Sequence, residues 1–343
     1  MKKPQNKAGT ILALAVTMLV ATAWSCASQP PPKTTPTPTV PPAQTPTPTP
    51  KPQKTRAESI PANAVKITPE TDILPPIMHS GEFNKPIPLG SAINTAGAED
   101  SAFVTPDGNT LYFFFTPDPS IPAEKQLTDG VTGIYVSQKQ GGQWSNAQRV
   151  MLIENNEVAL DGCVFVQGNE MWFCSARKGN LRGVDLWTAR FNNGRWTDWK
   201  HAGKKLNVDY EVGEMHITAD GNEMYFHSPR AGGKGGYDIW VTKKMNGEWQ
   251  PPENVSSVNT PEAEGWPFIT QDSNELWFLR NYKGSPAIFR SKKIGGKWGE
   301  PELIVSQFAA EPSLDNAGNL YFTHHYFKDG KMLEADIYLA PRK

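Results

Sequence analysis

The feature that most limits the fold of this chain is a strand–turn–strand pattern that recurs between Ser101 and His324. Each copy has an apolar strand, a tight turn containing Asp-Gly, Gly-Asn or Ser-Asn, and an aromatic strand. Such dipeptides suit the backbone dihedrals of short hairpin turns, so each copy predicts a β-hairpin. The copies read SAFVTPDGNTLYFFF, GCVFVQGNEMWFC, MHITADGNEMYFH, PFITQDSNELWFL and PSLDNAGNLYFTH.

Every hairpin is followed by a third strand, and the first four copies continue with a Gly turn and a Trp-led fourth segment. The third strands are GIYVSQ, VDLWTAR, YDIWVTK, AIFRSK and ADIYLAP, and the tryptophans are Trp144, Trp196, Trp249 and Trp298. Four short strands repeating at roughly 50 residues are typical of β-propeller blades. A large aromatic on the outer strand can fill the gap between splayed blades. We therefore predict an all-β fold, a β-propeller of five blades.

The fifth copy lacks a fourth strand, because the chain stops at Lys343 shortly after ADIYLAP. A matching segment lies at the other end: GEFNKPIPLGSAINTAGAE, residues 81–99, parallels GEWQPPENVSSVNTPEAE, residues 247–264. In this alignment Phe83 corresponds to Trp249, and Asn94 to Asn259. We expect the N-terminal segment to complete the last blade and close the ring, which removes open sheet edges.

One pair of segments carries a family resemblance. SPRAGGKGGYDIW followed by GEWQPPENVSSVNT resembles the WD-like β-propeller repeats of bacterial exported proteins, which also occur in the periplasmic propeller of the Tol system. The resemblance covers residues 81–343 and is weakest in the first repeat, which carries the longer insert TPDPSIPAEKQLTDG. It implies a propeller, an exported location and a binding role. It transfers no functional residue, because these repeats have no fixed catalytic motif.

The N-terminus predicts export. Lysines, an apolar run from Ile11 to Ala23 and small residues indicate a signal peptide over residues 1–25, too short for a convincing membrane span. ATAWSC resembles a bacterial lipobox, which predicts lipid attachment at Cys26 on the extracytoplasmic face of the cell membrane. The alternative is plain cleavage after Ala21-Thr22-Ala23, which gives a secreted or periplasmic protein.

A low-complexity stalk follows the signal. Residues 26–65 are rich in Pro and Thr and predict a disordered, extended segment, because such a sequence cannot pack a core. A semi-rigid stalk after a lipid-bearing cysteine would hold a domain away from the membrane. The predicted propeller domain then covers residues 66–343.

Several function classes are not supported. The formal net charge is -1 without a basic stripe, which argues against a nucleic-acid partner. The chain has no Gly-x-Ser-x-Gly elbow and no Walker-type loop, and we predict no cofactor. We also predict no metal site, because His324 and His325 are adjacent in a strand and point to opposite faces.

Two cysteines lie in one predicted hairpin, CVFVQGNEMWFC. With the turn at Gly168-Asn169, counting outward places Cys163 directly opposite Cys174. A cross-strand disulfide is one interpretation for an exported protein, although directly opposed pairs are strained. The other is a pair of small buried thiols.

Acidic residues recur near the start of each first strand, and arginines recur in the loops between second and third strands. Both should lie on one face of a propeller, around the mouth of its channel, where they would form a polar ligand site. The alternative is that they pair with one another and hold the blades in place. The candidates are Glu99, Asp100, Asp161, Glu214, Glu264, Glu311, Arg177, Arg230 and Arg280.

Three functions remain, one of them a spacer or scaffold within a multiprotein envelope complex. The first is a binding or interaction module at the cell envelope, with a glycan, peptide or envelope protein as partner and no enzymatic activity. The alternative is a propeller glycoside hydrolase, in which Asp100, Asp161 and Glu214 would supply the acid and the base or nucleophile. Against it, these three carboxylates occupy nearly equivalent repeat positions, as repetition alone would produce.

Overall fold

The computed structural model describes residues 54–154 and 157–343. Its strands form five consecutive groups of antiparallel neighbours. Group one holds β3 (Ala98–Val104), β4 (Thr110–Thr116), β5 (Gly133–Gln140), β6 (Gln143–Trp144) and β7 (Gln148–Arg149). Group two holds β8 (Ala159–Gln167), β9 (Glu170–Arg177), β10 (Asp185–Asn192) and β11 (Arg195–His201).

The remaining groups repeat this order. Group three holds β12 (Met215–Ile217), β13 (Glu223–Ser228), β14 (Asp238–Met245), β15 (Glu248–Trp249) and β16 (Glu253–Asn254). Group four holds β17 (Glu264–Ile269), β18 (Glu275–Tyr282), β19 (Ser285–Ile294), β20 (Lys297–Trp298), β21 (Glu302–Ser306) and, from the N-terminal segment, β1 (Ile77–Met78). Group five holds β22 (Ala309–Leu314), β23 (Leu320–Lys328), β24 (Lys331–Ala340) and β2 (Ile87–Pro88).

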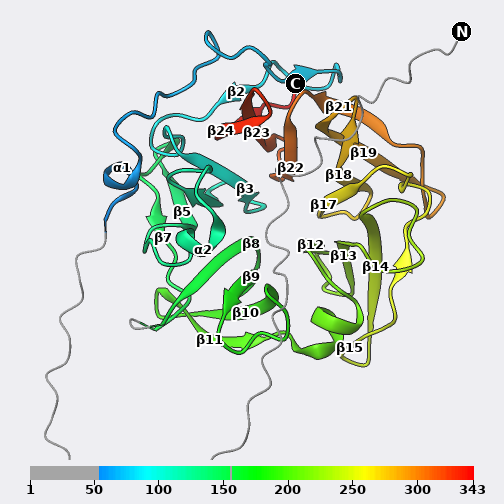
Figure 1. Ribbon diagram of the computed structural model, residues 1–343. Helices are drawn as coiled ribbons and strands as arrows, with labels where there is room; N and C mark the ends of the chain where they lie inside the picture. The colour runs from blue at the N-terminus through cyan, green and yellow to red at the C-terminus, as the bar shows by residue number, and fades with distance from the viewer. Residues whose placement is uncertain (1–53, 155–156) are drawn as a thin grey trace, which may run out of the picture.

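The groups are arranged around a centre, with β3, β8, β12, β17 and β22 innermost (Figure 1). Groups one and five join in one sheet through a single parallel residue pair, Ala98 with Ala335. Radially arranged antiparallel sheets with the first strands inside are the architecture of a β-propeller. The predicted all-β propeller is therefore confirmed.

Side-chain hydrogen bonds explain the hairpin turns. Thr270 Oγ1 donates to Asp272 at 2.6 Å, and Asp272 accepts the Asn274 N–H at 3.0 Å. Equivalent contacts at Asp107 and Asp220 hold the turns of groups one and three. Asp and Asn favour such turns because their side chains bond the local backbone. The repeated turn sequence therefore encodes one repeated local structure.

Buried aromatic clusters join each group to the next. One cluster spans groups one to three with Tyr112, Phe173 and Phe226; the others join groups three and four (Tyr225, Phe278), four and five (Trp277, Phe322), and five and one (Tyr321, Phe113). The outer tryptophans contribute to them as predicted: Trp298 contacts Tyr225 and Trp144 contacts Tyr321, each in a neighbouring group.

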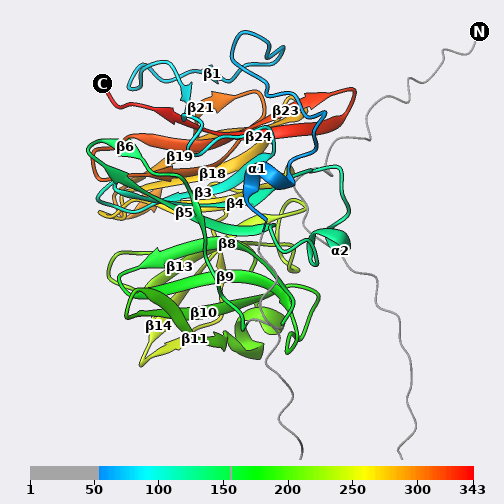
Figure 2. The same cartoon turned by 90° about the vertical axis from the view of Figure 1, so that its left-hand side faces the viewer.

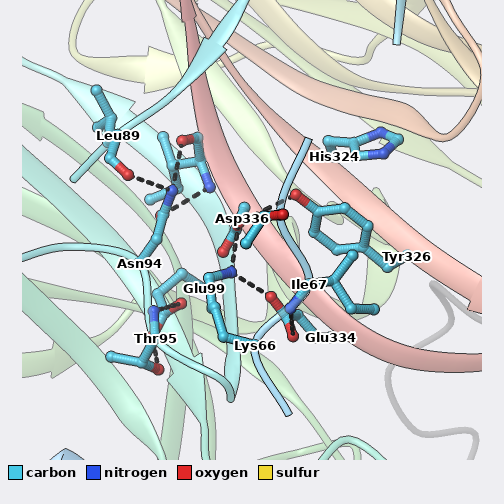
Figure 3. A network of polar contacts seen from close by, with 12 residues as sticks. Lys66, Ile67, Leu89, Asn94, Thr95, Glu99, His324, Tyr326, Glu334 and Asp336 are labelled. Carbon is cyan, nitrogen blue, oxygen red and sulfur yellow. Dashed lines mark hydrogen bonds and ion pairs between the residues drawn. The ribbon is translucent and has the colours of Figure 1, made fainter. Parts of the chain in front are cut away.

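The expected pairing between the N-terminal segment and the last strand is present. Ile87 and Pro88 of β2 lie opposite Leu339 and Tyr338 of β24. Asn94, labelled in Figure 3, adds a side-chain bridge, because its amide bonds both the N–H and the carbonyl oxygen of Ile337 at 3.0 Å. The same bridge forms after group three, where Asn259, in the segment leading to group four, bonds both backbone groups of Ile239 at 2.8 Å.

Helical structure is limited to short turns, and no described helix is long and apolar enough to cross a membrane. They are α1 (Arg56–Ser59), α2 (Ala123–Gln126) within the long insert of the first repeat, and the π-helical η1 (Lys205–Asp209). The signal peptide, Cys26 and most of the predicted stalk lie outside the described residues.

The packed part of the chain begins before the predicted boundary at Lys66. α1 lies against group one in both views (Figures 1 and 2), where Arg56 bonds Glu99. Further along, Lys66 contacts Glu334 and Asp336 of β24 (Figure 3). These cations neutralise buried carboxylates, which is why a segment without a core of its own packs here.

A β-bulge interrupts four of the five inner strands, and it overturns the predicted cysteine pairing. In β8 the register shifts between Gly162 and Phe165, so Gly162 lies opposite Cys174. Cys163 takes the bulge position with φ 53°. Both cysteines are free thiols, and the disulfide is not present. A bulge places an extra residue on one strand, which a count outward from the turn cannot detect.

Candidate functional site

The acidic residues of the inner strands fall into two sets when the observed registers are used. Phe103, Phe165, His216, Phe268 and Ser313 occupy equivalent positions, each opposite an aromatic residue of the second strand. Four residues earlier lie Glu99, Asp161 and Glu264, which we call the clamp carboxylates. Two or three residues earlier lie Asp100, Glu214 and Glu311, which we call the axial carboxylates.

Glu264 shows the clamp arrangement most completely. Arg280 Nε donates to Glu264 at 2.8 Å, and its Nη2 donates to the Val258 carbonyl oxygen at 2.6 Å. Thr260 donates its N–H and hydroxyl to the same carboxylate. The guanidinium also lies 4.5 Å from the centre of the Phe289 ring, a cation–π distance. Glu264 therefore anchors a loop to its own group.

Asp161 is held in the same way in group two. Arg177 Nη2 donates to Asp161 at 2.5 Å, and Nη1 donates to the Leu152 carbonyl oxygen at 2.8 Å. The Ser175 hydroxyl donates to Asp161 at 2.6 Å, and Trp187 lies beneath the guanidinium. These contacts occupy Asp161, so it is not available as the third axial carboxylate that the hydrolase alternative required.

Glu99 has a clamp whose arginine comes from outside the repeats. Arg56 Nη1 donates to Glu99 at 3.1 Å and to the Ile93 carbonyl oxygen at 2.7 Å, and the guanidinium lies over Phe115. Burial raises the pKa of Glu99 to about 7, although hydrogen bonds from Thr95 and the charge of Arg56 oppose this shift. The N-terminal segment thus supplies the cation that group one lacks.

Arg230 occupies the corresponding part of group three without a carboxylate partner. Its guanidinium lies near the rings of Tyr210 and Trp240, at 5.8 and 4.8 Å. Val212 stands where the clamp carboxylate would be, and the buried Nη1 of Arg230 has no hydrogen-bond partner among the described residues. Of the three predicted arginines, only Arg230 is free of an ion pair within that part of the chain.

Two of the three axial carboxylates border a cavity of about 50 Å³ at the centre of the sheets. Glu214 and Glu311 line it together with Ser101, His216 and Trp266. A water molecule needs about 10–15 Å³ of cavity volume, so this cavity can hold a few water molecules or a small ion.

Asp100 and Glu311 form a compact cluster with His325. His325 Nε2 lies 3.4 Å from Asp100 Oδ1, and Ser101 donates its N–H to Glu311 at 2.7 Å. Burial, with the charge and hydrogen bonding of Asp100, raises the pKa of Glu311 far above its usual range. Burial would also raise the pKa of Asp100, but the charge of His325 and a hydrogen bond with Glu311 hold it well below its usual range.

Glu214 precedes β12 of group three, whereas the cluster comes from groups one and five, and the Glu214 carboxyl group contacts Cys163. Burial raises the pKa of Glu214 to about 7, and the negative charge of Asp100 adds to the shift. Beside it, burial among aromatic rings lowers the pKa of His216 to about 3, so this imidazole is neutral at pH 7. The axis therefore collects acidic groups without a lysine or arginine partner among the described residues.

A second, more open cavity of about 400 Å³ lies at the hairpin turns of groups three and four. Its lining includes Asp220, Glu223, Lys243, Lys244 and Lys293. Its volume falls within the usual range of small-molecule pockets, whereas the axial cavity does not. This cavity of ligand size therefore lies away from the axis.

The structure brings together three of the predicted site residues, Asp100, Glu214 and Glu311. It places Asp161, Glu264, Arg177 and Arg280 in the ion pairs that were the alternative to a ligand site. Sequence reasoning missed His325 as an axial residue and Arg56 as a clamp residue. His325 was assigned only to a strand face, and Arg56 lies in a segment predicted to be disordered.

The fold and these two sets of carboxylates define a β-propeller protein with an acidic axis. No family model matches the chain, and no curated protein matches it either.

Solved propellers resemble its backbone. An α-L-arabinofuranosidase from Lactobacillus brevis has 11% identity and a TM-score of 0.49, over 74% of this chain and 92% of that one. An endo-arabinase from Bacteroides thetaiotaomicron has 15% identity and a TM-score of 0.48, over 75% and 96%. TolB from Acinetobacter baumannii has 14% identity and a TM-score of 0.43, over 73% and 56%.

Proposed function

We propose that this protein is an exported, lipid-anchored β-propeller that acts as a binding module at the cell envelope. Cys26 would carry the lipid, and the Pro/Thr-rich segment would hold the propeller away from the membrane. The ligand is a glycan, a peptide or an envelope protein. It would contact the face where Arg177 ends β9, Arg280 lies near the end of β18 and the loop after β13 carries Arg230; only Arg230 lies in a loop, where the sequence placed all three.

We further propose that five blades form a closed ring. Two contacts support closure: the aromatic cluster between groups five and one, and the Asn94 bridge to Ile337. The latter repeats the Asn259 bridge to Ile239, which holds the segment that leads from group three to group four. A closed ring gives a rigid binding face without open sheet edges.

The observation that carries the binding role is the state of the inner carboxylates. Each clamp carboxylate is paired with an arginine, and two axial carboxylates, Glu214 and Glu311, border a cavity of about 50 Å³, far below the size of usual ligand pockets. A glycoside hydrolase must place two carboxyl groups on either side of a sugar bond. A ligand on this face would instead rest on the loops above the axis.

Glycoside hydrolysis is a second candidate because of one residue. The pKa of Glu214 is raised to about 7, as a general acid requires near neutral pH. This candidate predicts release of reducing sugar from an oligosaccharide and its loss in Glu214→Gln.

The test is a thermal-shift screen of the full chain carrying Cys26→Ser, against cell-wall fragments, oligosaccharides and peptides, with reducing-sugar release measured in parallel. A ligand at about 100 times its Kd should add about 2.7 kcal/mol of stability. We expect Arg230→Gln to reduce the shift, and the exposed Glu170→Gln to leave it unchanged. Sugar release that depends on Glu214 would contradict the binding role.

The anchor is tested separately by fatty-acid labelling of the full chain in a bacterial host. We expect label in the wild-type chain and none in Cys26→Ser, which should appear in the soluble extracytoplasmic fraction. Equal labelling of both chains would exclude Cys26 as the attachment site.

A further inference from the structure

We infer that Asp100, Glu311 and His325 form a binding site for one divalent transition-metal ion at the axis of the propeller. The three residues come from β3, β22 and β23, which lie side by side where groups one and five meet. Each offers one ligand atom, and these atoms all lie within 4.8 Å of one another. This site does not depend on the ligand proposed above.

The charge balance of the inner strands supports a bound cation. Each clamp carboxylate has an arginine within 3.1 Å. In the described residues neither Asp100 nor Glu311 has an ion pair with lysine or arginine, and Asp100 has only His325. Two neighbouring carboxylates without such a partner must retain a proton or bind a cation. A metal ion would supply the countercharge that the repeats provide elsewhere as arginine.

The surroundings of the His325 ring also support a metal site. It is only 1% exposed, and its Nε2 faces Asp100 at 3.4 Å. Its Nδ1 is buried without a hydrogen-bond partner in the described part of the chain. A fully buried imidazole normally bonds through both nitrogens. Here the single polar contact of the ring is directed into the carboxylate cluster, as a ligand nitrogen would be.

The surroundings fix the ligands and leave room for water. The Ser101 backbone N–H donates to Glu311 at 2.7 Å, and the His325 backbone N–H donates to the Phe308 carbonyl oxygen at 2.9 Å. Ser101 and Glu311 border the cavity of about 50 Å³, which can hold water molecules at the remaining coordination positions. One imidazole with two carboxylates suits Mn²⁺ or Zn²⁺ better than Ca²⁺, which prefers oxygen ligands alone.

The experiment measures Mn²⁺ binding to the chelator-treated full chain carrying Cys26→Ser. Electron paramagnetic resonance counts free Mn²⁺ during a titration, and electron spin echo modulation detects a nitrogen ligand. We expect one Mn²⁺ per chain, a histidine nitrogen signal, and affinities reduced more than about tenfold in Asp100→Asn and Glu311→Gln. His325→Gln should abolish the nitrogen signal.

Glu214→Gln is the matched control, because Glu214 is an acidic residue at the same cavity but outside the three ligands. It should bind Mn²⁺ within about twofold of the wild-type chain. Zn²⁺ is titrated by calorimetry into the wild-type chain and Cys163→Ser, since zinc could otherwise bind the neighbouring thiol.

Three results would overturn the site: no stoichiometric Mn²⁺ or Zn²⁺ binding by the folded wild-type chain, binding without a nitrogen signal, or equal weakening in Glu214→Gln. Circular dichroism checks that each variant is folded. If either Asp100→Asn or Glu311→Gln does not fold, the site is still tested by the nitrogen signal of the wild-type chain and by the Mn²⁺ affinity of the other variant.

Discussion

The clamp carboxylates and the axial carboxylates occupy positions only one or two residues apart in the repeated inner strand, yet their surroundings are opposite. Glu264 is bonded by Arg280 and Thr260, and the Arg280 guanidinium packs on the Phe289 ring. Glu311 has no arginine and faces Asp100 and His325 instead. A shift of one or two positions along an inner strand therefore separates a carboxylate that serves the fold from one left without a countercharge.

This comparison shows how to interpret repeats. A side chain that recurs with its partner, as Asp161 and Glu264 recur with Arg177 and Arg280, stabilises each copy. The informative positions are those where copies differ. The position of Glu214 and Glu311 is Ser101 in group one, Cys163 in group two and Trp266 in group four. No two neighbouring groups present the same residue there, so the axis is not shaped by repetition.

Breaking a clamp should have the largest effect. Arg280→Ala leaves Glu264 buried and unpaired, and we expect the free energy of unfolding to fall by about 3–5 kcal/mol in urea denaturation at pH 7. Arg230→Ala removes a similar arginine that has no carboxylate, and should cost about 1 kcal/mol. Equal losses in the two variants would show that stacking, and not the ion pair, stabilises the loops.

Removing the cation of the N-terminal clamp should have a smaller effect. Arg56→Ala leaves Glu99 unpaired, but with a pKa already near 7 this carboxyl group can take up a proton instead of remaining charged. We expect a loss of about 2 kcal/mol at pH 7 in urea denaturation. Lys54→Ala, at an exposed position nearby, is the control. No loss in Arg56→Ala would mean that α1 does not pack on group one in solution.

At the axis, Glu214→Gln should stabilise the protein at high pH. Because the pKa of Glu214 is about 7 in the folded state and ordinarily 4.5, the folded state binds more protons between these values. The free energy of unfolding should therefore fall as pH rises from about 4.5 to about 7. Glu214→Gln should be about 1–2 kcal/mol more stable than wild type at pH 8 and equal to it at pH 4. Thermal unfolding of both chains is measured from pH 4 to pH 8. If their stabilities changed in parallel with pH, Glu214 would not be the group that titrates.

The smallest effect is expected at Glu82, which has an excess of cations. A hydrogen bond from Arg290, together with the charges of Arg290, Arg342 and Lys292, lowers the pKa of Glu82 to about 2, against the cost of burial. Its stabilising contribution is complete above about pH 4.5 and is lost as pH falls toward 2. Because its side chain is 34% exposed, Glu82→Gln should cost about 1 kcal/mol at pH 7 and nothing at pH 2. If the stability difference between wild type and Glu82→Gln grew as pH fell, the folded state would raise the pKa of Glu82 and not lower it.

The sequence predicted those parts of the fold that depend on local chemistry. Turns such as Thr270–Asn274 and the outer tryptophans are encoded by short patterns, and both were identified. The bulge at Cys163 was not, because it depends on the packing of inner strands around a common centre and has no residue signature. That one-residue shift is also what separates the two sets of carboxylates.

The site was predicted only in part for a related reason. Asp100, Glu214 and Glu311 were identified as candidates, but together with acids that have a different role. Arg56 could not be assigned, since its partner Glu99 is 43 positions away and no other copy takes its arginine from outside the repeats. A signal was available: the second strand of group one has no arginine near its end, where groups two and four have Arg177 and Arg280.

The bridge between Asn94 and Ile337 joins residues 243 positions apart. During synthesis Asn94 is made early, and its contact with Ile337 can form only after nearly the whole chain has been synthesised. Contacts of such long sequence separation form late and slowly, because the loop they close is costly in entropy. We expect folding to end with this step, so that an incomplete chain exposes strand edges and is prone to aggregation or proteolysis. Loss of the last residues of β24 should therefore destabilise the whole propeller and not only its last group.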